Sequence, residues 1–191
     1  MIHEVIVTCR SPEGENQIAP MGITWNQGKL VIAPFRPSRT LSNILSSECA
    51  VINYCDDVRI FAGCLSGRYD WPLIEAERVA APRLVGSLAH TEVQLERVED
   101  DPVRPRLICR PVYETEHRPF RGFNRAQAAV LELAILVSRL HMLPTEKIER
   151  EIDYLAIAVE KTAGQRQREA WSWLMERVEA HRRERAQEPV Q

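Results

Sequence analysis

The chain has 191 residues, of which 45% are hydrophobic and 27% are charged, a balance typical of a soluble globular protein. Its formal net charge of −2 argues against a surface that binds polyanions, so we expect no nucleic-acid partner. No apolar run approaches the roughly 20 residues of a membrane-spanning helix, and the N-terminus lacks a signal-peptide pattern. We therefore expect no membrane span.

Residues 1–117 have the short apolar runs and turn signals of a mainly β fold. Strands are expected in HEVIVTC, IAPMGITW and KLVIAPF, the last two joined by the tight hairpin turn NQG. A short helix over 38–47 and the β-rich run CAVINYC follow, whereas VRIFAGCL fits either a helix or a strand. After an irregular connection over 66–83, two long strands form a hairpin with the polar tip EDDPVRP. The series predicts a small antiparallel barrel.

The alternation in the first strand of this hairpin assigns side chains to two faces. Val93 and Leu95 share one face, and Glu92 lies on the other face together with Gln94 and Glu96. Thr91 is a further candidate for the face that Val93 and Leu95 share.

From Asn124 onward the hydrophobic period becomes helical. Asn124 is a good N-cap for a helix over 125–142, which is apolar on so much of its surface that it should be buried on several sides. A second helix begins at Thr145 and a third covers about 166–185. The sequence therefore predicts an α+β protein, with an antiparallel β-barrel domain over 1–120 and a small C-terminal helical subdomain over 121–191.

The cysteines and the absent motifs limit the chemistry. The five cysteines are odd in number and none has C-x-x-C spacing, so we expect buried free thiols in a reducing cytoplasm, with no disulfide and no metal site. The chain lacks G-x-G-x-x-G, P-loop, G-x-S-x-G and H-E-x-x-H motifs. No catalytic residue can be named, and the two histidines His117 and His141 are expected to be structural or exposed.

Two arginines lie where the helix over 38–47 should begin, in the segment APFRPSRTLSNIL. A helix N-terminus carries unpaired N–H groups and a partial positive charge, which disfavours nearby cations. The presence of both Arg36 and Arg39 therefore suggests that a small anion binds here. The alternative is that Ser38 merely caps the helix and the arginines face solvent.

Four motifs together carry a family resemblance. NQIAPMGITW, APFRPSRTLSNI, AVINYCDDVRIFA and RGFNRAQAAVLELAILVSRL occur in the order found in the FMN-binding split-barrel superfamily. The chain resembles the branch that carries a C-terminal helical subdomain. This resemblance implies a flavin-reductase-like split barrel, with FMN bound at a homodimer interface.

The resemblance also implies where the flavin phosphate would bind. The segment after the third strand and the following helix N-terminus would hold it, a good match of hydroxyls, guanidinium groups and free N–H groups to phosphate. The candidates are Arg36, Ser38, Arg39 and Thr40, and Asn43 on the same helix is a further candidate for cofactor binding. We expect Ser38 and Thr40 to donate hydroxyl hydrogen bonds and at least one arginine to supply charge.

The segment Ala19, Pro20, Met21, Gly22 resembles the strand that follows the isoalloxazine edge in relatives. Backbone groups would bind the pyrimidine side of the ring, and Gly22 would permit close approach. The alternative is that Pro20 and Gly22 only shape a bend in the barrel. Asn53 is polar within an apolar run and either contacts flavin or locks a neighbouring loop.

The cluster RGFNRA repeats the pattern of arginines at a helix N-terminus. The similar segment in relatives reaches a flavin, either that of its own subunit or that of the partner subunit. The resemblance therefore makes Asn124 and Arg125 candidate flavin-binding residues. The alternative is that Asn124 only caps its helix and Arg125 pairs with Glu132 or with the barrel.

Three functions are compatible with these residues. The first is a flavin-dependent oxidoreductase or flavin reductase, in which FMN exchanges hydride with an unknown small substrate. The second is a non-catalytic FMN carrier or sensor, consistent with the lack of an identifiable proton donor. The third is a dimeric scaffold that has lost its ligand, consistent with the very apolar helix over 125–142.

Overall fold

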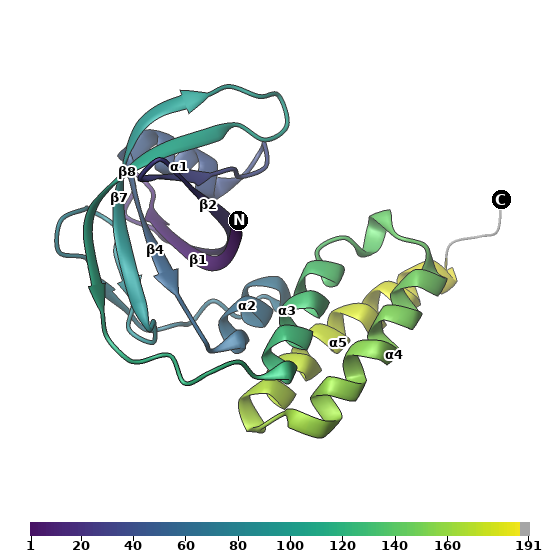
Figure 1. The fold of residues 1–191 in the computed structure, drawn as a ribbon. Coiled ribbons are helices and arrows are strands. Elements are labelled where there is room, and N and C mark those ends of the chain that lie inside the picture. Colours follow the sequence, from purple (N-terminus) through teal and green to yellow (C-terminus); the bar gives the residue numbers. More distant parts are fainter. Residues whose placement is uncertain (188–191) are drawn as a thin grey trace. The chain divides into compact units, whose positions relative to one another are not determined.

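The computed structural model describes residues 1–187, and residues 188–191 at the end of the predicted helical segment lie outside the described residues. The chain forms two compact units (Figure 1). The barrel unit comprises Met1–Asp56 and Asp70–Phe120. The helical unit comprises Asp57–Tyr69 together with the chain from Arg121 onward. Residues 57–69, within the segment that the sequence assigns to the barrel, are therefore packed with the C-terminal helices.

Six antiparallel strands close into a barrel in the order β1-β2-β3-β8-β7-β4. This confirms the predicted α+β class with an antiparallel barrel first and helices after it. The strands are β1 (Ile2–Arg10), β2 (Asn16–Asn26), β3 (Lys29–Ile32), β4 (Cys49–Tyr54), β7 (Ala89–Glu99) and β8 (Arg106–Glu116).

Alternating apolar side chains fill the barrel interior. On β1 the inward residues are Val5, Val7 and Cys9, all at most 1% exposed. Val93 and Leu95 of β7, which were predicted to share one face, pack in the same core. Full burial of one such valine or leucine side chain contributes roughly 1.5–3 kcal/mol. The barrel is therefore held mainly by this core.

Helix α1 (Arg39–Ser47) packs on the barrel core. Leu41 and Ile44 join the core cluster, and Ser38 is the N-cap, the role given above as the alternative to anion binding. Glu48 ends the helix in the left-handed region at φ 52°, and its N–H donates to the carbonyl of Ile44. Because the apolar side of α1 is buried in the barrel, its first residue, Arg39, is left at the surface.

A small two-stranded sheet, β5 (Leu73–Glu75) with β6 (Pro82–Leu84), lies on the outer side of β1 and β4. The connection over 66–83, expected to be irregular, thus contains short strands. Glu92, which was predicted to lie on the face opposite Val93, faces out of the barrel but is fully buried. The loop between β5 and β6 covers it, and its carboxylate accepts three backbone N–H bonds of 2.6–3.0 Å from that loop.

The helical unit contains α2 (Val58–Ser66), α3 (Arg125–Val137), α4 (Thr145–Thr162) and α5 (Gln165–Gln187), with a 3-10 turn at Leu140–Met142. The ambiguous run VRIFAGCL is α2, capped by Asp57 at its start and by Gly67, at φ 81°, at its end. The helix predicted over 125–142 ends earlier, at Val137. There the Ser138 hydroxyl donates to the carbonyl of Ile135, and a 3-10 turn follows.

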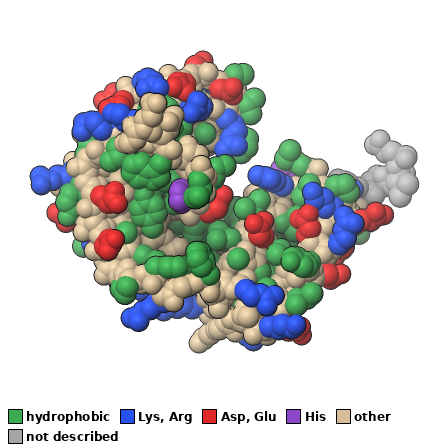
Figure 2. Space-filling model, in the orientation of Figure 1, with side chains coloured by type: hydrophobic (Ala, Val, Ile, Leu, Met, Phe, Trp, Pro, Cys, Tyr) green, Lys and Arg blue, Asp and Glu red, His purple; other side chains and the backbone are tan. Residues whose placement is uncertain are grey.

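The helices enclose a second apolar core. Its buried residues come from every helix of the unit and include Val58, Val130, Leu133, Ile152 and Leu174. The burial of α3 on several sides agrees with its apolar sequence. No helix within residues 1–187 is long and apolar enough to cross a membrane. On the visible surface of each unit, positive and negative side chains are interspersed (Figure 2).

All five cysteines are free, as predicted, and all but the half-buried Cys55 are buried. Burial raises the pKa of Cys9 to about 11 and the pKa values of Cys64 and Cys109 to about 12. These thiols are therefore protonated and unreactive near neutral pH. No metal-binding group of His, Cys, Asp or Glu occurs in the part of the chain that the structure describes.

Candidate functional site

The loop that leads from β3 into α1 presents Ser38 and Arg39 at the start of the helix. The Ser38 Oγ accepts a 3.3 Å hydrogen bond from the N–H of Leu41. A hydroxyl that accepts one hydrogen bond retains its proton for donation, so Ser38 can also donate to an anion. The peptide bond between Arg36 and Pro37 is cis.

The two arginines of this segment differ in their surroundings. Arg36 donates from Nη2 to the Asp100 carboxylate at 2.9 Å, and its backbone N–H donates to the carbonyl of Val103 at 2.9 Å. Arg39 is exposed and forms no ion pair or side-chain hydrogen bond within residues 1–187. Arg39 is therefore the guanidinium that is available to a ligand at this helix start.

Two predicted members of the site are turned toward the protein interior. Thr40 is 3% exposed and Asn43 is 9% exposed. Burial raises the pKa of the Cys9 thiol, and a hydrogen bond with the Asn43 side chain lowers it by a smaller amount. Thr40, a predicted hydroxyl donor to the phosphate, is thus buried where α1 packs on the barrel, and its donation to a phosphate stays a prediction.

The segment Ala19–Gly22 forms the middle of β2, and one of its edges has no strand partner among the residues that the structure describes. It pairs with β1 along its whole length, whereas β3 pairs with β2 only from Ile23 to Asn26. All four residues are half-buried, and Met21 packs against the barrel core. Pro20 is tolerated here because an unpaired edge needs no N–H donor.

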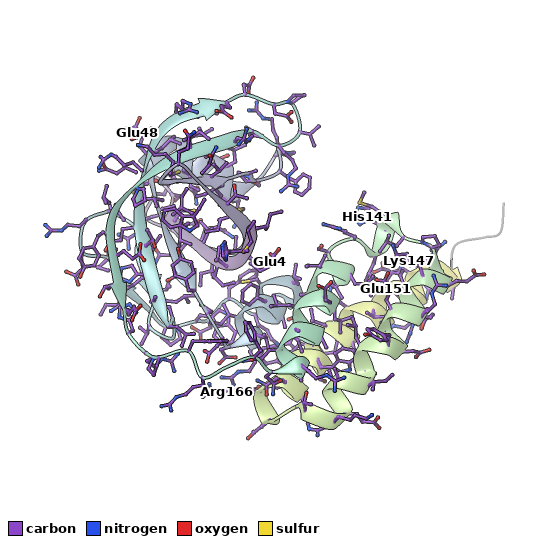
Figure 3. The ribbon with its side chains drawn as sticks, viewed as in Figure 1. Glu4, Glu48, His141, Lys147, Glu151 and Arg166 are labelled. Carbon is purple, nitrogen blue, oxygen red and sulfur yellow. The ribbon has the colours of Figure 1, made fainter. Side chains whose placement is uncertain are left out.

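Gly22 allows a close approach, and the approaching group is a side chain of β1. A Cβ atom at Gly22 would lie 2.9 Å from Cγ2 of Ile2 and 3.5 Å from Oε1 of Glu4. Glu4, labelled on β1 in Figure 3, is exposed and pairs directly with Gly22 across the two strands. The outer face beside Gly22 thus carries one carboxylate.

Asn53 is fully buried and serves the barrel. Its Nδ2 donates to the carbonyl of Ile6 at 3.1 Å and to Oγ1 of Thr8 at 3.0 Å. Its Oδ1 accepts from the N–H of Leu84 at 2.7 Å, which ties β6 to the barrel. Of the two alternatives for Asn53, the structure supports the loop lock, because the side chain has no exposed surface for a ligand.

Asn124 and Arg125 belong to the helical unit. The Asn124 Oδ1 accepts from the N–H groups of Ala126 and Gln127, which confirms the predicted cap. Its Nδ2 donates to the carbonyl of Thr162 at 3.1 Å. Arg125 is exposed, and within residues 1–187 it forms no ion pair with Glu132.

Three residues of the β7–β8 hairpin tip contact the loop before α1, and the sequence alone did not indicate them. Asp100 and Val103 hold Arg36, and Arg104 donates from Nη2 to the carbonyl of Ala33 at 3.0 Å. The Arg104 guanidinium also lies 4.5 Å from the centre of the Phe35 ring. The tip was predicted only as a polar turn, because nothing local indicates a contact 71 residues away.

A second missed cluster lies on β7 and just after β8. Nδ1 of His90 is 2.9 Å from Nε2 of His117, and Nε2 of His90 is 3.2 Å from Oε1 of Glu92. Partial burial of the ring lowers the pKa of His117, and the nearby charges of Arg83, His90 and Arg118 lower it further. His117 is exposed, so the expectation of a structural or exposed histidine agrees with its place in the fold.

Family models match both units of the chain. Residues 3–118 match the model described as Protein of unknown function (DUF447) N-terminal domain, and residues 124–176 match Protein of unknown function (DUF447). The chain belongs to the DUF447 family. The family boundary between 118 and 124 coincides with the passage from the barrel unit to the C-terminal helices. A search of curated proteins returned no match for this DUF447 chain.

Solved structures share the fold of this DUF447 chain. An FMN-bound DUF447 protein from Methanosarcina mazei is 18% identical and superposes with a TM-score of 0.80 over 92% of this chain and 94% of its own. The 2-nitrobenzoate 2-nitroreductase of Pseudomonas fluorescens is 22% identical, with a TM-score of 0.52 over 60% of this chain and 64% of its own.

Component B of nitrilotriacetate monooxygenase from Bacillus cereus is 20% identical, with a TM-score of 0.52 over 67% of this chain and 77% of its own. The likeness to the Methanosarcina mazei protein covers both units, whereas the other two cover about two thirds of the chain. Together the comparisons show that the chain belongs to the DUF447 family and that it shares its barrel fold with these solved structures.

Proposed function

We propose that this DUF447 protein binds FMN in the barrel unit, as a homodimer, and acts as a flavin-dependent oxidoreductase on an unknown small substrate. The observation that carries the proposal is the likeness, over 92% of the chain, to an FMN-bound member of the same family. The residues at the start of α1 and along β2 supply the chemistry that such a cofactor needs.

The start of α1 fits the phosphate of FMN. The first N–H groups of a helix have no intrahelical partner and point toward an anion at the N-terminus. Ser38 has a hydroxyl proton to donate, and Arg39 is an exposed guanidinium with no partner among the described residues. Together they offer neutral and charged donors on one helical turn, which suits a dianionic phosphate.

The unpaired edge of β2 fits the isoalloxazine ring. Along Ala19–Gly22 the backbone groups that face away from β1 have no strand partner within residues 1–187. Such groups can read the donor and acceptor pattern of a pyrimidine edge. We propose that this segment orients the ring and that Glu4, beside Gly22, lies at its margin.

The flavin would supply hydride transfer, and the protein would supply position, charge and exclusion of water. We assign no catalytic side chain. Large apolar side chains that the barrel unit exposes, including Ile2, Trp25 and Phe35, support a homodimer that buries part of this surface. The free cysteines support a reducing, cytoplasmic location.

The visible spectrum of the purified protein tests FMN binding, and release of the pigment followed by mass spectrometry identifies it. Light scattering measures the oligomeric state. Anaerobic addition of NADH or NADPH should bleach the flavin band if the protein is an oxidoreductase. Stoichiometric FMN without bleaching or turnover would favour a carrier or sensor. A colourless protein that does not quench added FMN fluorescence would contradict the proposal.

A further inference from the structure

The tip of the β7–β8 hairpin reaches the loop that precedes α1. We use the term hairpin tip for Asp100, Asp101, Val103 and Arg104. Two backbone-directed contacts hold the loop: the N–H of Arg36 donates to the carbonyl of Val103 at 2.9 Å, and Arg104 donates to the carbonyl of Ala33 at 3.0 Å. One side-chain ion pair, from Arg36 to Asp100, adds to them.

The hairpin tip is itself ordered by Asp101. The Asp101 Oδ1 accepts the N–H groups of Val103 at 2.8 Å and Arg104 at 2.6 Å, and these two bonds lower the pKa of the Asp101 carboxyl. An aspartate that bonds the backbone two and three residues on stabilises a turn. The side chain of Arg104 then lies over the ring of Phe35, which further fixes its guanidinium.

These contacts give the two arginines of the candidate phosphate site different tasks. A phosphate that bound to the Arg36 guanidinium would have to displace the Asp100 carboxylate, an anion already in place at 2.9 Å. Arg39 has no such competitor within residues 1–187. Both arginines carry the same charge, so it is the contacts of Arg36 with the hairpin tip that make only Arg39 available to a phosphate.

We propose that the hairpin tip is a positioning element of the phosphate site. Asp100 keeps the Arg36 guanidinium in an ion pair, and Arg104 holds the loop through the carbonyl of Ala33. Arg39 is therefore the guanidinium that binds the phosphate. The proposal rests on the proposed binding of FMN at the start of α1. It assigns Asp100 and Arg104 a function in cofactor selectivity, through Arg36 and the loop rather than through contact with the flavin.

The test compares FMN with riboflavin, which lacks the phosphate. Dissociation constants for both are measured by fluorescence quenching at low and high salt, and the affinity ratio of FMN to riboflavin reports on the phosphate site alone. Loss of one charge-assisted contact corresponds to about tenfold or more in affinity. Arg39→Gln should therefore lower the ratio about tenfold, whereas Arg36→Gln should change it by less than about threefold.

The positioning residues have their own signatures. Arg104→Gln should lower the ratio, and Arg104→Lys, which retains a donor and a cation over Phe35, should restore most of it. Asp100→Asn should raise the ratio because it releases Arg36 toward the phosphate, and this rise should vanish when Arg36→Gln is added. Arg110→Gln, on β8 and outside the tip, is the matched control. Circular dichroism confirms that each variant is folded.

The outcomes separate this inference from the proposed function. If the wild-type protein binds FMN no better than riboflavin, or binds neither, the proposed function fails. If Arg39→Gln lowers the ratio but Arg36→Gln lowers it equally, or Arg104→Gln leaves it unchanged, only the role of the hairpin tip is refuted. Competition with inorganic phosphate should weaken FMN binding in the wild type and much less in Arg39→Gln.

Discussion

Replacement of Glu92 by glutamine should destabilise the barrel unit strongly. The Glu92 carboxylate is fully buried and accepts backbone N–H bonds from Glu77 at 2.7 Å, Arg78 at 2.6 Å and Val79 at 3.0 Å. Glutamine has nearly the same shape, but one of its two polar groups is an NH₂ donor. Whichever position that NH₂ group takes, at least one backbone N–H group loses its acceptor and the negative charge is removed.

The magnitude follows from the number of bonds affected. A hydrogen bond to a charged group contributes about 1.5–3 kcal/mol, and a buried donor left unsatisfied costs about 1–3 kcal/mol. We therefore expect Glu92→Gln to lower the free energy of unfolding by about 2–5 kcal/mol. This is a large part of the roughly 5–15 kcal/mol that stabilises a typical domain.

Urea denaturation followed by circular dichroism measures the loss of stability, and hydrogen exchange at the amides of Glu77, Arg78 and Val79 measures it locally. These amides should exchange much faster in Glu92→Gln. Glu114→Gln is the matched control, because Glu114 is an exposed residue of the partner strand β8 and the change should stay within about 0.5 kcal/mol. An unfolding free energy equal to that of the control, with unchanged exchange, would refute the assigned role of Glu92.

Three further predictions concern other parts of the chain. The double change Ser38→Ala and Arg39→Ala should abolish measurable FMN binding in a titration and leave the circular dichroism spectrum unchanged; retained affinity would contradict the phosphate assignment. Asn53→Ala should lower the free energy of unfolding by about 2–4 kcal/mol in urea, since it leaves the buried N–H of β6 without an acceptor. Burial by itself would raise the pKa of Asp57. The hydrogen bonds from Arg59 and the positive charges of Arg59 and Arg166 have the larger combined effect, so the pKa lies below its ordinary value. The stability that this aspartate contributes is thus present above about pH 4 and is lost as the pH falls further, so the stability difference between wild type and Arg59→Gln should shrink between pH 6 and pH 3.

Local sequence patterns predicted much of this fold correctly. The run HEVIVTC was predicted as a strand, and it forms β1, whose residues Val5, Val7 and Cys9 lie in the barrel core. Ser38 and Asn124 each precede an apolar helical pattern and each cap a helix. Such signals are recognisable because strand periodicity and capping depend on residues within one or two turns of each other.

Burial of single polar residues was less predictable. Glu92 and Thr40 are typical surface residue types, and both are buried here. The first is covered by the loop between β5 and β6, and the second by the packing of α1 on the barrel. Their burial depends on which other segment of the chain covers them. The hydrophobic periodicity of their own strand or helix contains no information about that segment.

The sequence by itself determined the two periodicities, the helix caps, the free cysteines and the family resemblance that points to a flavin. Only the tertiary structure decided how the two arginines before α1 differ. Closure of the barrel brings the β7–β8 hairpin tip to residues 33–36, so that Asp100 pairs with Arg36 and no described residue pairs with Arg39. The physical reason is that an ion pair depends on distance in space, and the two members of this one are 64 residues apart in the chain.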